Sequence, residues 1–183
     1  MGRAKPRCAW CGDDPRYVAY HDEEWGVPVR DDRLLFEQLI LEGAQAGLSW
    51  ITVLRKRDRY RKAFANFDPR KVARFDGRKV DALMADAGLV RHRGKLASVA
   101  PNARAFLAIQ EEHGSFADWL WAHVGGRPVV RRARTPQATS PLAQKISMEL
   151  RKRGMKFVGP TIMQAYLQAV GVLDEHAPGC WKA

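Results

Sequence analysis

Residues 83–96 read LMADAGLVRHRGKL, and this stretch decides the architecture that we expect. An apolar helical pattern stops at Gly88, and Gly94 opens a second helix after a short basic turn. Two helices joined by a glycine-bounded hairpin present free backbone N–H groups at the second helix's amino end, where the local dipole favours a phosphate. The turn also carries three cations, Arg91, Arg93 and Lys95. The alternative is an ordinary corner between helices with a solvated basic face.

The sequence on both sides of this hairpin is helical, so we predict an all-α fold. Capping residues mark the starts of the helices, and glycines mark several ends. The expected helices run from Asp31 or Asp32 to Gly47, Ser49 to Phe64, Asp68 to Phe75, Asp76 to Ala87, Gly94 to Glu112, Ser115 to Gly125, Ser140 to Arg153, and Gly159 to Val172. Residues 127–141 read as an irregular linker, in which Val129-Val130 is the only hint of extended chain.

The size and charge of the chain narrow the classes of protein that it can belong to. Its 183 residues suit one domain, residues 1–183, with one sizeable core. The 31 basic and 20 acidic side chains give a net charge of +11. Such an excess favours polyanionic partners, with nucleic acid as the first candidate. The alternative is a basic enzyme that uses its charge for nothing specific.

No apolar run approaches the roughly 18 residues that a membrane span requires. The amino terminus, MGRAKPRCAW, lacks the apolar core of a signal peptide, so we expect a cytoplasmic protein without membrane attachment. Three cysteines in such a chain favour a metal site or free thiols over a disulfide framework.

One acidic residue stands out within residues 38–54 (QLILEGAQAGLSWITVL), because Glu42 is the only ionisable side chain there. Helical spacing from Leu35 and Leu39 puts it on the apolar stripe and not on the solvated face. A buried carboxylate without partners costs several kcal/mol or takes up a proton. Glu42 therefore either has an internal ion-pair partner or faces a pocket in which a ligand supplies the hydrogen-bond donors.

The two ends of the chain carry candidate metal ligands. Cys8-x2-Cys11 and His176-x3-Cys180 have the spacing of a Cys3His zinc site that would join the termini. His21 is a fifth candidate, although tetrahedral zinc needs only four ligands. The alternative is two terminal segments with free thiols.

Several further motifs occur together and in order along the chain. They are Cys8-Ala9-Trp10, residues 14–28 (DPRYVAYHDEEWGVP), 41–54 (LEGAQAGLSWITVL), 88–95 (GLVRHRGK), 152–161 (KRGMKFVGPT) and the segment from His176 to Cys180. With these motifs the chain resembles the 3-methyladenine DNA glycosylase I family over nearly its whole length. That family belongs to the helix–hairpin–helix glycosylase superfamily, which agrees with the hairpin expected above.

The resemblance implies a set of site residues. It places a structural zinc ion on Cys8, His21, His176 and Cys180, in conflict with the spacing argument that prefers Cys11 to His21. We follow the resemblance, because its DPxYxAYHDxEWG motif carries His21. It also implies a base pocket formed by Glu42 with Trp10, Tyr20 and Trp50, although core packing is the usual fate of such aromatics. Arg91, Arg93, Gly94 and Lys95 are the expected DNA contacts.

The resemblance further implies hydrolysis of the N-glycosidic bond of 3-methyladenine in double-stranded DNA. The nucleotide would be flipped out of the duplex, and Glu42 would serve recognition, catalysis or both. No Asp lies between Leu96 and Ala117, where many relatives in the superfamily carry a catalytic one. We expect a monofunctional enzyme, because no lysine is an obvious Schiff-base nucleophile. We also expect a monomer.

Two other functions compete with this interpretation. A zinc-stabilised DNA-binding module without catalysis would hold Glu42 in an ion pair and would not bind the free base. A zinc hydrolase for a small substrate would need an open coordination position on the metal.

Overall fold

The computed structural model describes residues 5–133, 135 and 137–183. Its helices and strands are α1 (Pro15–Glu23), α2 (Asp32–Gln45), α3 (Trp50–Leu54), α4 (Arg57–Ala63), α5 (Pro69–Val72), α6 (Gly77–Ala85), α7 (Arg93–His113), α8 (Phe116–Ala122), β1 (Val129–Val130), α9 (Pro141–Lys152), α10 (Pro160–Ala169) and β2 (Leu173–Asp174). Two short 3₁₀ turns occur at Ala9–Cys11 and Ala65–Phe67. The prediction of an all-α fold is therefore confirmed, apart from one short pair of strands.

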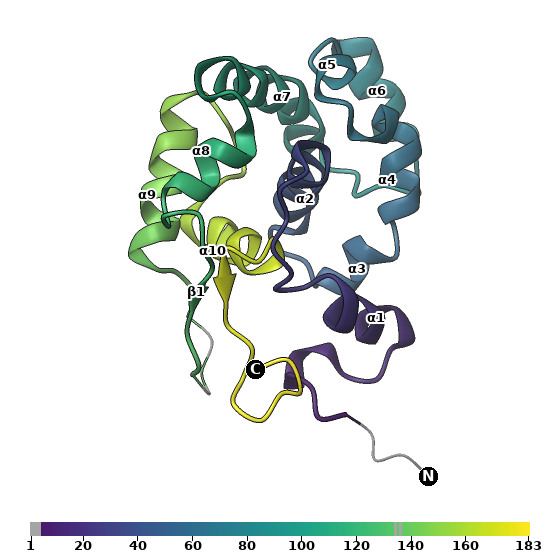
Figure 1. The fold of residues 1–183 in the computed structure, drawn as a ribbon. Helices are drawn as coiled ribbons and strands as arrows, with labels where there is room; N and C mark the ends of the chain where they lie inside the picture. The colour runs from purple at the N-terminus through teal and green to yellow at the C-terminus, as the bar shows by residue number, and fades with distance from the viewer. Residues whose placement is uncertain (1–4, 134, 136) are drawn as a thin grey trace.

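Helix α2 lies at the centre of the molecule, with α8 and α9 on one side and α4 to α6 on the other (Figure 1). Every residue from 35 to 44 is buried, so α2 has no solvated face along that length. A helix that is surrounded in this way reads as apolar all round, which is why the acids on it need an explanation. Phe36 of α2 contacts the rings of Phe67 and Phe106, and Phe106 stacks on Phe116 in the same core.

Helices α6 and α7 form the helix–hairpin–helix expected from residues 83–96. Asp86 accepts a hydrogen bond from the N–H of Gly88 at 2.8 Å, which closes the first half of the turn. A Cβ atom on Gly88 would come within 2.6 Å of the Arg59 side chain, so only glycine fits this turn without a shift. Helix α7 begins at Arg93, where His92 is the N-cap residue and accepts from the N–H of Lys95 at 3.2 Å.

The expected extended segment Val129–Val130 is confirmed as β1, and it pairs in parallel with β2. The register joins Val129 to Leu173 and Val130 to Asp174. No separate signal predicted β2, because the expected last helix ran on to Val172. The expected linker, 127–141, contains residues 134 and 136, which lie outside the described residues.

Two helices predicted from sequence have the wrong extent. Ser49 to Phe64 is not one helix, because α3 ends at Leu54 and α4 begins at Arg57, whose guanidinium reaches Glu24 and Glu37. The last helix ends at Ala169, since Gly171 adopts a φ of 72° that turns the chain toward β2.

Helix α1 was not among the expected helices, although it has a clear start signal. Asp14 accepts hydrogen bonds from the N–H groups of Arg16 and Tyr17, and Pro15 occupies the first helical position. The pair Asp68-Pro69 starts α5 in the same way, so the same rule would have found α1. Helix α1 supplies one wall of the site described below.

None of the helices within the described ranges is both long and apolar enough to span a membrane. The chain's first and last segments lie side by side, with the segment that follows β2 running next to the residues before α1 (Figure 1).

Candidate functional site

Glu42 lies in the last two turns of α2 with only 3% of its surface exposed. Its Oε1 accepts one hydrogen bond, from Nε2 of Gln38 at 3.1 Å. Its Oε2 is buried and has no hydrogen-bond partner among the described residues. Burial raises the pKa of this carboxyl to about 8, although the Gln38 hydrogen bond acts in the opposite direction. A buried acid that lacks a partner for one oxygen is poised to bind a ligand that donates hydrogen bonds.

Glu37, a second buried acid on α2, can be compared with Glu42. It is equally buried, but its Oε1 accepts from Nε of Arg57 at 2.5 Å and from Nε of Arg61 at 3.0 Å. Glu37 is therefore a satisfied structural acid. Of the two buried acids on α2, Glu37 has cation partners, whereas Glu42 has none within residues 5–133, 135 and 137–183.

Aromatic rings surround the carboxylate of Glu42. The rings of Tyr20 and Trp50 are tilted against each other with centroids 5.3 Å apart, and both residues are buried. Trp10 is only partly buried, and its ring lies 6.3 Å from that of Tyr20 in an edge-to-face arrangement. The Nε1 of Trp50 is buried without a partner among the described residues. The three aromatics expected around Glu42 are therefore brought together with it.

These side chains line a cavity of about 430 Å³, enough for a ligand the size of a purine base. The sequence interpretation missed several of its wall residues, Tyr17, Trp25, Gln45, Arg131, Gln168 and Glu175. Arg131 and Glu175 form an ion pair across one wall at 2.8 Å, and Gln168 donates to the same carboxylate at 2.6 Å. These residues come from segments far apart in the chain, so no local sequence signal could have grouped them.

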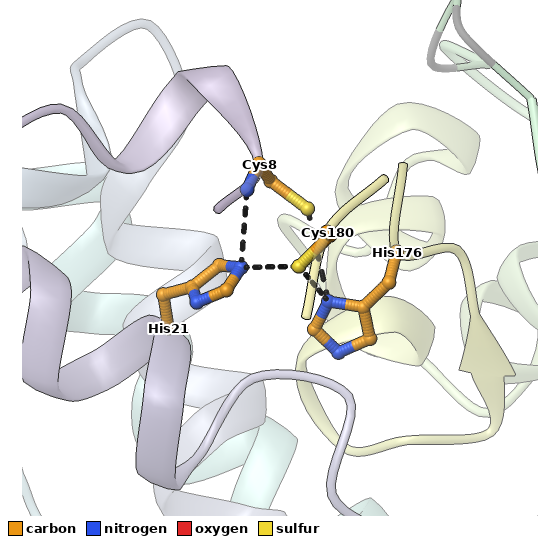
Figure 2. Close-up of side chains that lie close together, drawn as sticks. All are labelled: Cys8, His21, His176 and Cys180. Carbon is orange, nitrogen blue, oxygen red and sulfur yellow. Dashed lines mark hydrogen bonds between the residues drawn. The ribbon is translucent and has the colours of Figure 1, made fainter. Parts of the chain in front are cut away.

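A second cluster lies beside this cavity, where the two ends of the chain meet. Cys8 and His21 come from the N-terminal segment, and His176 and Cys180 come from the C-terminal segment (Figure 2). All four are buried, and their ligand atoms lie within 4.8 Å of one another. The two sulfur atoms each lie 3.7 Å from Nδ1 of His176, and Cys180 Sγ lies 3.4 Å from Nε2 of His21.

This donor set fits a tetrahedral metal ion. Zinc with bonds of about 2.0–2.3 Å to nitrogen and sulfur requires ligand atoms about 3.3–3.8 Å apart, and the closest contacts here match that spacing. Burial raises the pKa of the Cys8 thiol to about 11 and lowers the pKa of His176 to about 4. The thiolate of Cys8 and the imidazolium of His176 are therefore both unfavourable without a partner. The four side chains could therefore hold a metal.

Neighbouring residues hold the metal ligands in position. Asp22 lies 2.8 Å from Nδ1 of His21 and is itself bound by Arg7, which orients the imidazole so that Nε2 faces the cluster. Gly26 makes room on the other side, because a Cβ there would come within 2.7 Å of Nε2 of His176. Cys11 is buried but lies outside the group, and its thiol faces the carbonyl of Gly12 at 3.6 Å. The cluster thus contains His21 where the spacing argument had preferred Cys11.

The residues expected to contact DNA lie at the start of α7. Arg91, Arg93 and Gly94 are exposed. Arg93 makes an exposed ion pair with Asp81 of α6 at 2.6 Å, which is weak enough to yield to a phosphate. In the first turn of α7 the N–H of Lys95 donates to His92, whereas the N–H groups of Arg93 and Gly94 have no partner inside the helix and are available to an anion.

Lys95 faces inward, unlike its neighbours. Its Nζ donates to the carbonyl of Ala44 at 2.9 Å and to that of Ala46 at 2.5 Å, so the ammonium group caps the carboxyl end of α2. This geometry was not foreseen, because it depends on how α2 packs against α7. The ammonium group has three N–H donors, and the two carbonyls occupy two of them.

A helix–hairpin–helix scaffold beside an aromatic cavity with an unpaired acid defines a base-binding enzyme of the glycosylase class. Comparison with known proteins agrees with this. Residues 10–183 match the family model for methyladenine glycosylases. The chain therefore belongs to the methyladenine glycosylase family, and the family resemblance inferred from its motifs is confirmed.

Individual relatives are similar over nearly their whole length. The chain is 48% identical to DNA-3-methyladenine glycosylase 1 of Escherichia coli (strain K12) over 178 residues, covering 95% of both proteins. A crystal structure of 3-methyladenine DNA glycosylase I is 46% identical with a TM-score of 0.93, covering 96% of this chain and 98% of the other. The chain is also similar to a solved structure that describes 3-methyladenine recognition by 3-methyladenine DNA glycosylase I from Staphylococcus aureus. The identity is 37% and the TM-score 0.93, and the match covers 98% of this chain and 97% of the other.

Proposed function

We propose that this protein removes 3-methyladenine from alkylated double-stranded DNA by hydrolysing the N-glycosidic bond. Membership of the methyladenine glycosylase family supports the reaction class. One structural observation carries the assignment of the site, namely that the buried Oε2 of Glu42, in an aromatic-lined cavity, has no partner in the part of the chain that the structure describes. An acid held in an internal ion pair, as Glu37 is, would have argued for a DNA-binding module without catalysis.

The chemistry of the lesion matches the cavity. Adenine alkylated at N3 carries positive charge in the nucleoside, and aromatic faces attract such a cation by roughly 0.5–2 kcal/mol each. The carboxylate of Glu42 can accept a hydrogen bond from the exocyclic amine of adenine. Guanine would present a carbonyl oxygen at that position, which repels the carboxylate and leaves it unpaired. The cavity would therefore select a damaged adenine over guanine.

The reaction requires the nucleotide to leave the duplex, because a paired base cannot reach a cavity of this kind. Flipping costs a few kcal/mol, and backbone contacts from Arg91, Arg93, Gly94 and Lys95 would offset part of that cost. The charged base is already a good leaving group, so Glu42 would stabilise it as the bond to C1′ breaks and water attacks the sugar. No lysine occurs among the described residues that line the cavity, which supports a monofunctional enzyme that leaves the strand intact.

Zinc is the metal that we propose for the terminal cluster, because two thiolates and two imidazoles are a donor set that zinc prefers. Its four protein ligands would leave no open position, so its role would be structural. Joining the chain ends would hold α1 and the segment after β2, both of which contribute cavity walls, in their places. A zinc hydrolase would need a free coordination position, so this donor set disfavours that function.

The decisive experiment is the release of labelled 3-methyladenine from methylated duplex DNA by the wild type and by Glu42→Gln. We expect the variant to fold normally and to lose at least about 100-fold in kcat/KM, as for a group that stabilises a charged transition state. Glu111→Gln, at an exposed position, is the matched control and should retain full activity. Near-normal release by Glu42→Gln would remove Glu42 from the site.

We also propose that residues 1–183 act as one domain and as a monomer in the cytoplasm. The continuous hydrophobic core, which includes residues from Cys8 to Cys180, supports a single domain. A monomer leaves the hairpin and the cavity mouth free for a bent duplex. The cytoplasm follows from the proposed DNA substrate. Gel filtration with light scattering would test the oligomeric state.

A further inference from the structure

A five-residue pattern occurs twice just before the hairpin. Residues 68–72 read DPRKV and residues 76–80 read DGRKV. In both copies the Asp caps a helix through its side chain, at the start of α5 and of α6, and the Val is buried. The Arg and Lys between them occupy the second and third helical positions. The chain thus presents basic side chains at two successive helix starts.

Four cations gather at this turn between α5 and α6, and we call them the basic corner: Arg70, Lys71, Arg74 and Arg78. All four are exposed. None of them makes an ion pair with a carboxylate in residues 5–133, 135 or 137–183. The two acids nearest in sequence, Asp68 and Asp76, are occupied as helix caps. The charge of the corner is therefore available to a partner.

Helix stability does not account for all of these cations, because Arg78 lies in the first turn of α6, whereas Arg70 and Lys71 lie in the single turn of α5 and Arg74 follows its carboxyl end. A positive side chain in the first turn of a helix opposes the helix dipole, and acidic residues are favoured there instead. Arginines elsewhere in this part of the chain have internal partners, such as Asp86 for Arg59 and Glu37 for Arg61. Four exposed and unpaired charges, one of them at a position that the helix dipole opposes, point to a role in binding.

The basic corner is continuous with the DNA-contacting hairpin. Asp81 of α6 contacts Arg93 at the start of α7, and Arg78 precedes Asp81 by three residues, so it lies about 5 Å further along the same face of α6. Arg104 of α7 donates to the carbonyl of Ala73 at 2.8 Å and holds the corner against α7. Helices α5 and α6 lie together on the side of α2 that is opposite to α8 and α9 (Figure 1).

We propose that the basic corner binds backbone phosphates of the duplex that flanks the flipped nucleotide, as an extension of the hairpin contact. This inference rests on the proposed function only for the identity of the nucleic acid. Large apolar side chains are absent from the exposed surface of the corner, among the residues that the structure describes, which argues against a membrane as the partner. The charge complements DNA, and the contact is independent of base sequence.

The length of α6 sets the reach of this contact. Its nine residues extend about 13 Å, which corresponds to about 4 base pairs of duplex. The corner should therefore matter only for DNA that extends beyond the bases next to the lesion. That dependence on duplex length separates it from the hairpin, whose contact lies beside the flipped nucleotide.

The test uses the full-length protein with Arg70→Gln, Lys71→Gln, Arg74→Gln and Arg78→Gln combined. Fluorescence anisotropy would measure binding to two duplexes with a central abasic-site analogue, one of about 20 base pairs and one of about 5 base pairs closed by an uncharged linker, which ends short of the corner. For the long duplex we expect about a 10- to 100-fold weaker Kd at low salt, and a slope of log K against log salt that is reduced by about 2–4. For the short duplex the change should stay within about 3-fold.

Two further variants test whether the loss of binding comes from the basic corner itself. Combined neutralisation of Arg127, Lys145, Arg151 and Lys152, exposed on the side of α8 and α9, removes the same charge and should leave the long-duplex slope near that of the wild type. Combined Arg70→Lys, Arg74→Lys and Arg78→Lys should retain the wild-type slope, because phosphate contact requires only the charge.

Equal losses in the corner and control variants would overturn the proposal, as would equal losses on short and long duplexes or failure of the lysine variant. Circular dichroism and Tm measurements would verify that each variant is folded. Base release by the wild type is measured separately. An inactive wild type with length-dependent binding would refute the proposed function and leave the basic corner supported.

Discussion

Gln38 lies one helical turn before Glu42 and donates its side-chain amide N–H to Oε1 of that acid at 3.1 Å. Both residues are buried, so the geometry of the carboxylate is set from within α2. The hydrogen bond fixes one oxygen and leaves Oε2 for a ligand. It also favours the charged form of Glu42 and so lowers a pKa that burial raises to about 8. Gln38 is in this sense a positioning residue for Glu42.

We predict that Gln38→Met weakens excision at neutral pH. Loss of the amide donor leaves Glu42 more reluctant to ionise, so its pKa rises and the acidic limb of the pH–rate profile moves to higher pH. A hydrogen bond to a charged group contributes about 1.5–3 kcal/mol, so kcat/KM at pH 7 should fall about 10- to 100-fold. Activity should partly recover at higher pH, and a uniform loss at all pH values would contradict the assignment.

Other ionisable groups near Glu42 do not obscure this profile. Burial raises the pKa values of Tyr17, Tyr20 and Tyr166, so the three phenols keep their protons across the relevant range. Arg131 and Glu175 on the far wall of the cavity are paired with each other. Gln144→Met, at an exposed position on α9, is the matched control and should leave the profile unchanged.

A second prediction concerns stability and follows from the same buried acid. The pKa of Glu42 is about 8 in the folded protein against 4.5 as its ordinary value, so between these two values the folded state binds more protons than the unfolded state. Stability must then fall as pH rises through this window, at up to about 1.4 kcal/mol per pH unit. Glu42→Gln removes this dependence and should be the more stable protein above pH 8.

Denaturant unfolding of the wild type and Glu42→Gln at several pH values between 4 and 9 would check this. The difference between the two proteins isolates Glu42, because all other titrating groups are shared. Parallel stability curves across the range would mean that Glu42 is not the buried, proton-binding acid that the structure indicates.

Much of the fold could be predicted from sequence because its signals are local. Capping Asp and Ser residues, Asp68-Pro69 and the glycines of the hairpin act within a few residues, so they located most helices and the α6–α7 hairpin. The break between α3 and α4 could not be found in this way. It coincides with contacts from Arg57 to Glu24 and Glu37, and those partners are fixed only by tertiary packing.

The candidate site was also predictable only where its signals are local in the sequence. An acid on an apolar helical stripe marked Glu42 without any knowledge of the fold, but both its pocket and its lack of an internal cation required the structure. Spacing alone favoured Cys11 for the metal group, and it is the path of α1 that brings His21 there instead. The wall formed by Arg131 and Glu175 joins the start of the linker to the segment after β2, so no pattern in either segment reveals it.

The third prediction separates the cysteines. Cys8→Ser should lose bound zinc and lower the Tm, because it removes one of four convergent ligands, whereas Cys11→Ser should keep both. His21→Ala should behave as Cys8→Ser does. Zinc analysis of the purified proteins by mass spectrometry, with Tm from calorimetry, gives both readouts. Retention of zinc by Cys8→Ser together with its loss in Cys11→Ser would reverse the assignment.

The last prediction separates two neighbouring cations at the start of α7. Arg93 is exposed, and among the described residues it pairs only with the exposed Asp81. Arg93→Ala should therefore weaken binding to duplexes of any sequence while changing stability by less than about 0.5 kcal/mol. Its slope of log K against log salt should fall by about 0.9. Lys95 instead caps α2 through the carbonyls of Ala44 and Ala46.

Lys95→Met should therefore lower the free energy of unfolding by about 1–3 kcal/mol, because two partly buried carbonyl groups at the end of α2 lose their charged donor. Glu42 lies in that last part of α2, so base release should also fall even at saturating DNA. Denaturant unfolding, duplex binding and base release on both variants would resolve the two roles. An unchanged stability in Lys95→Met, with a salt slope reduced as in Arg93→Ala, would instead make Lys95 a simple phosphate contact.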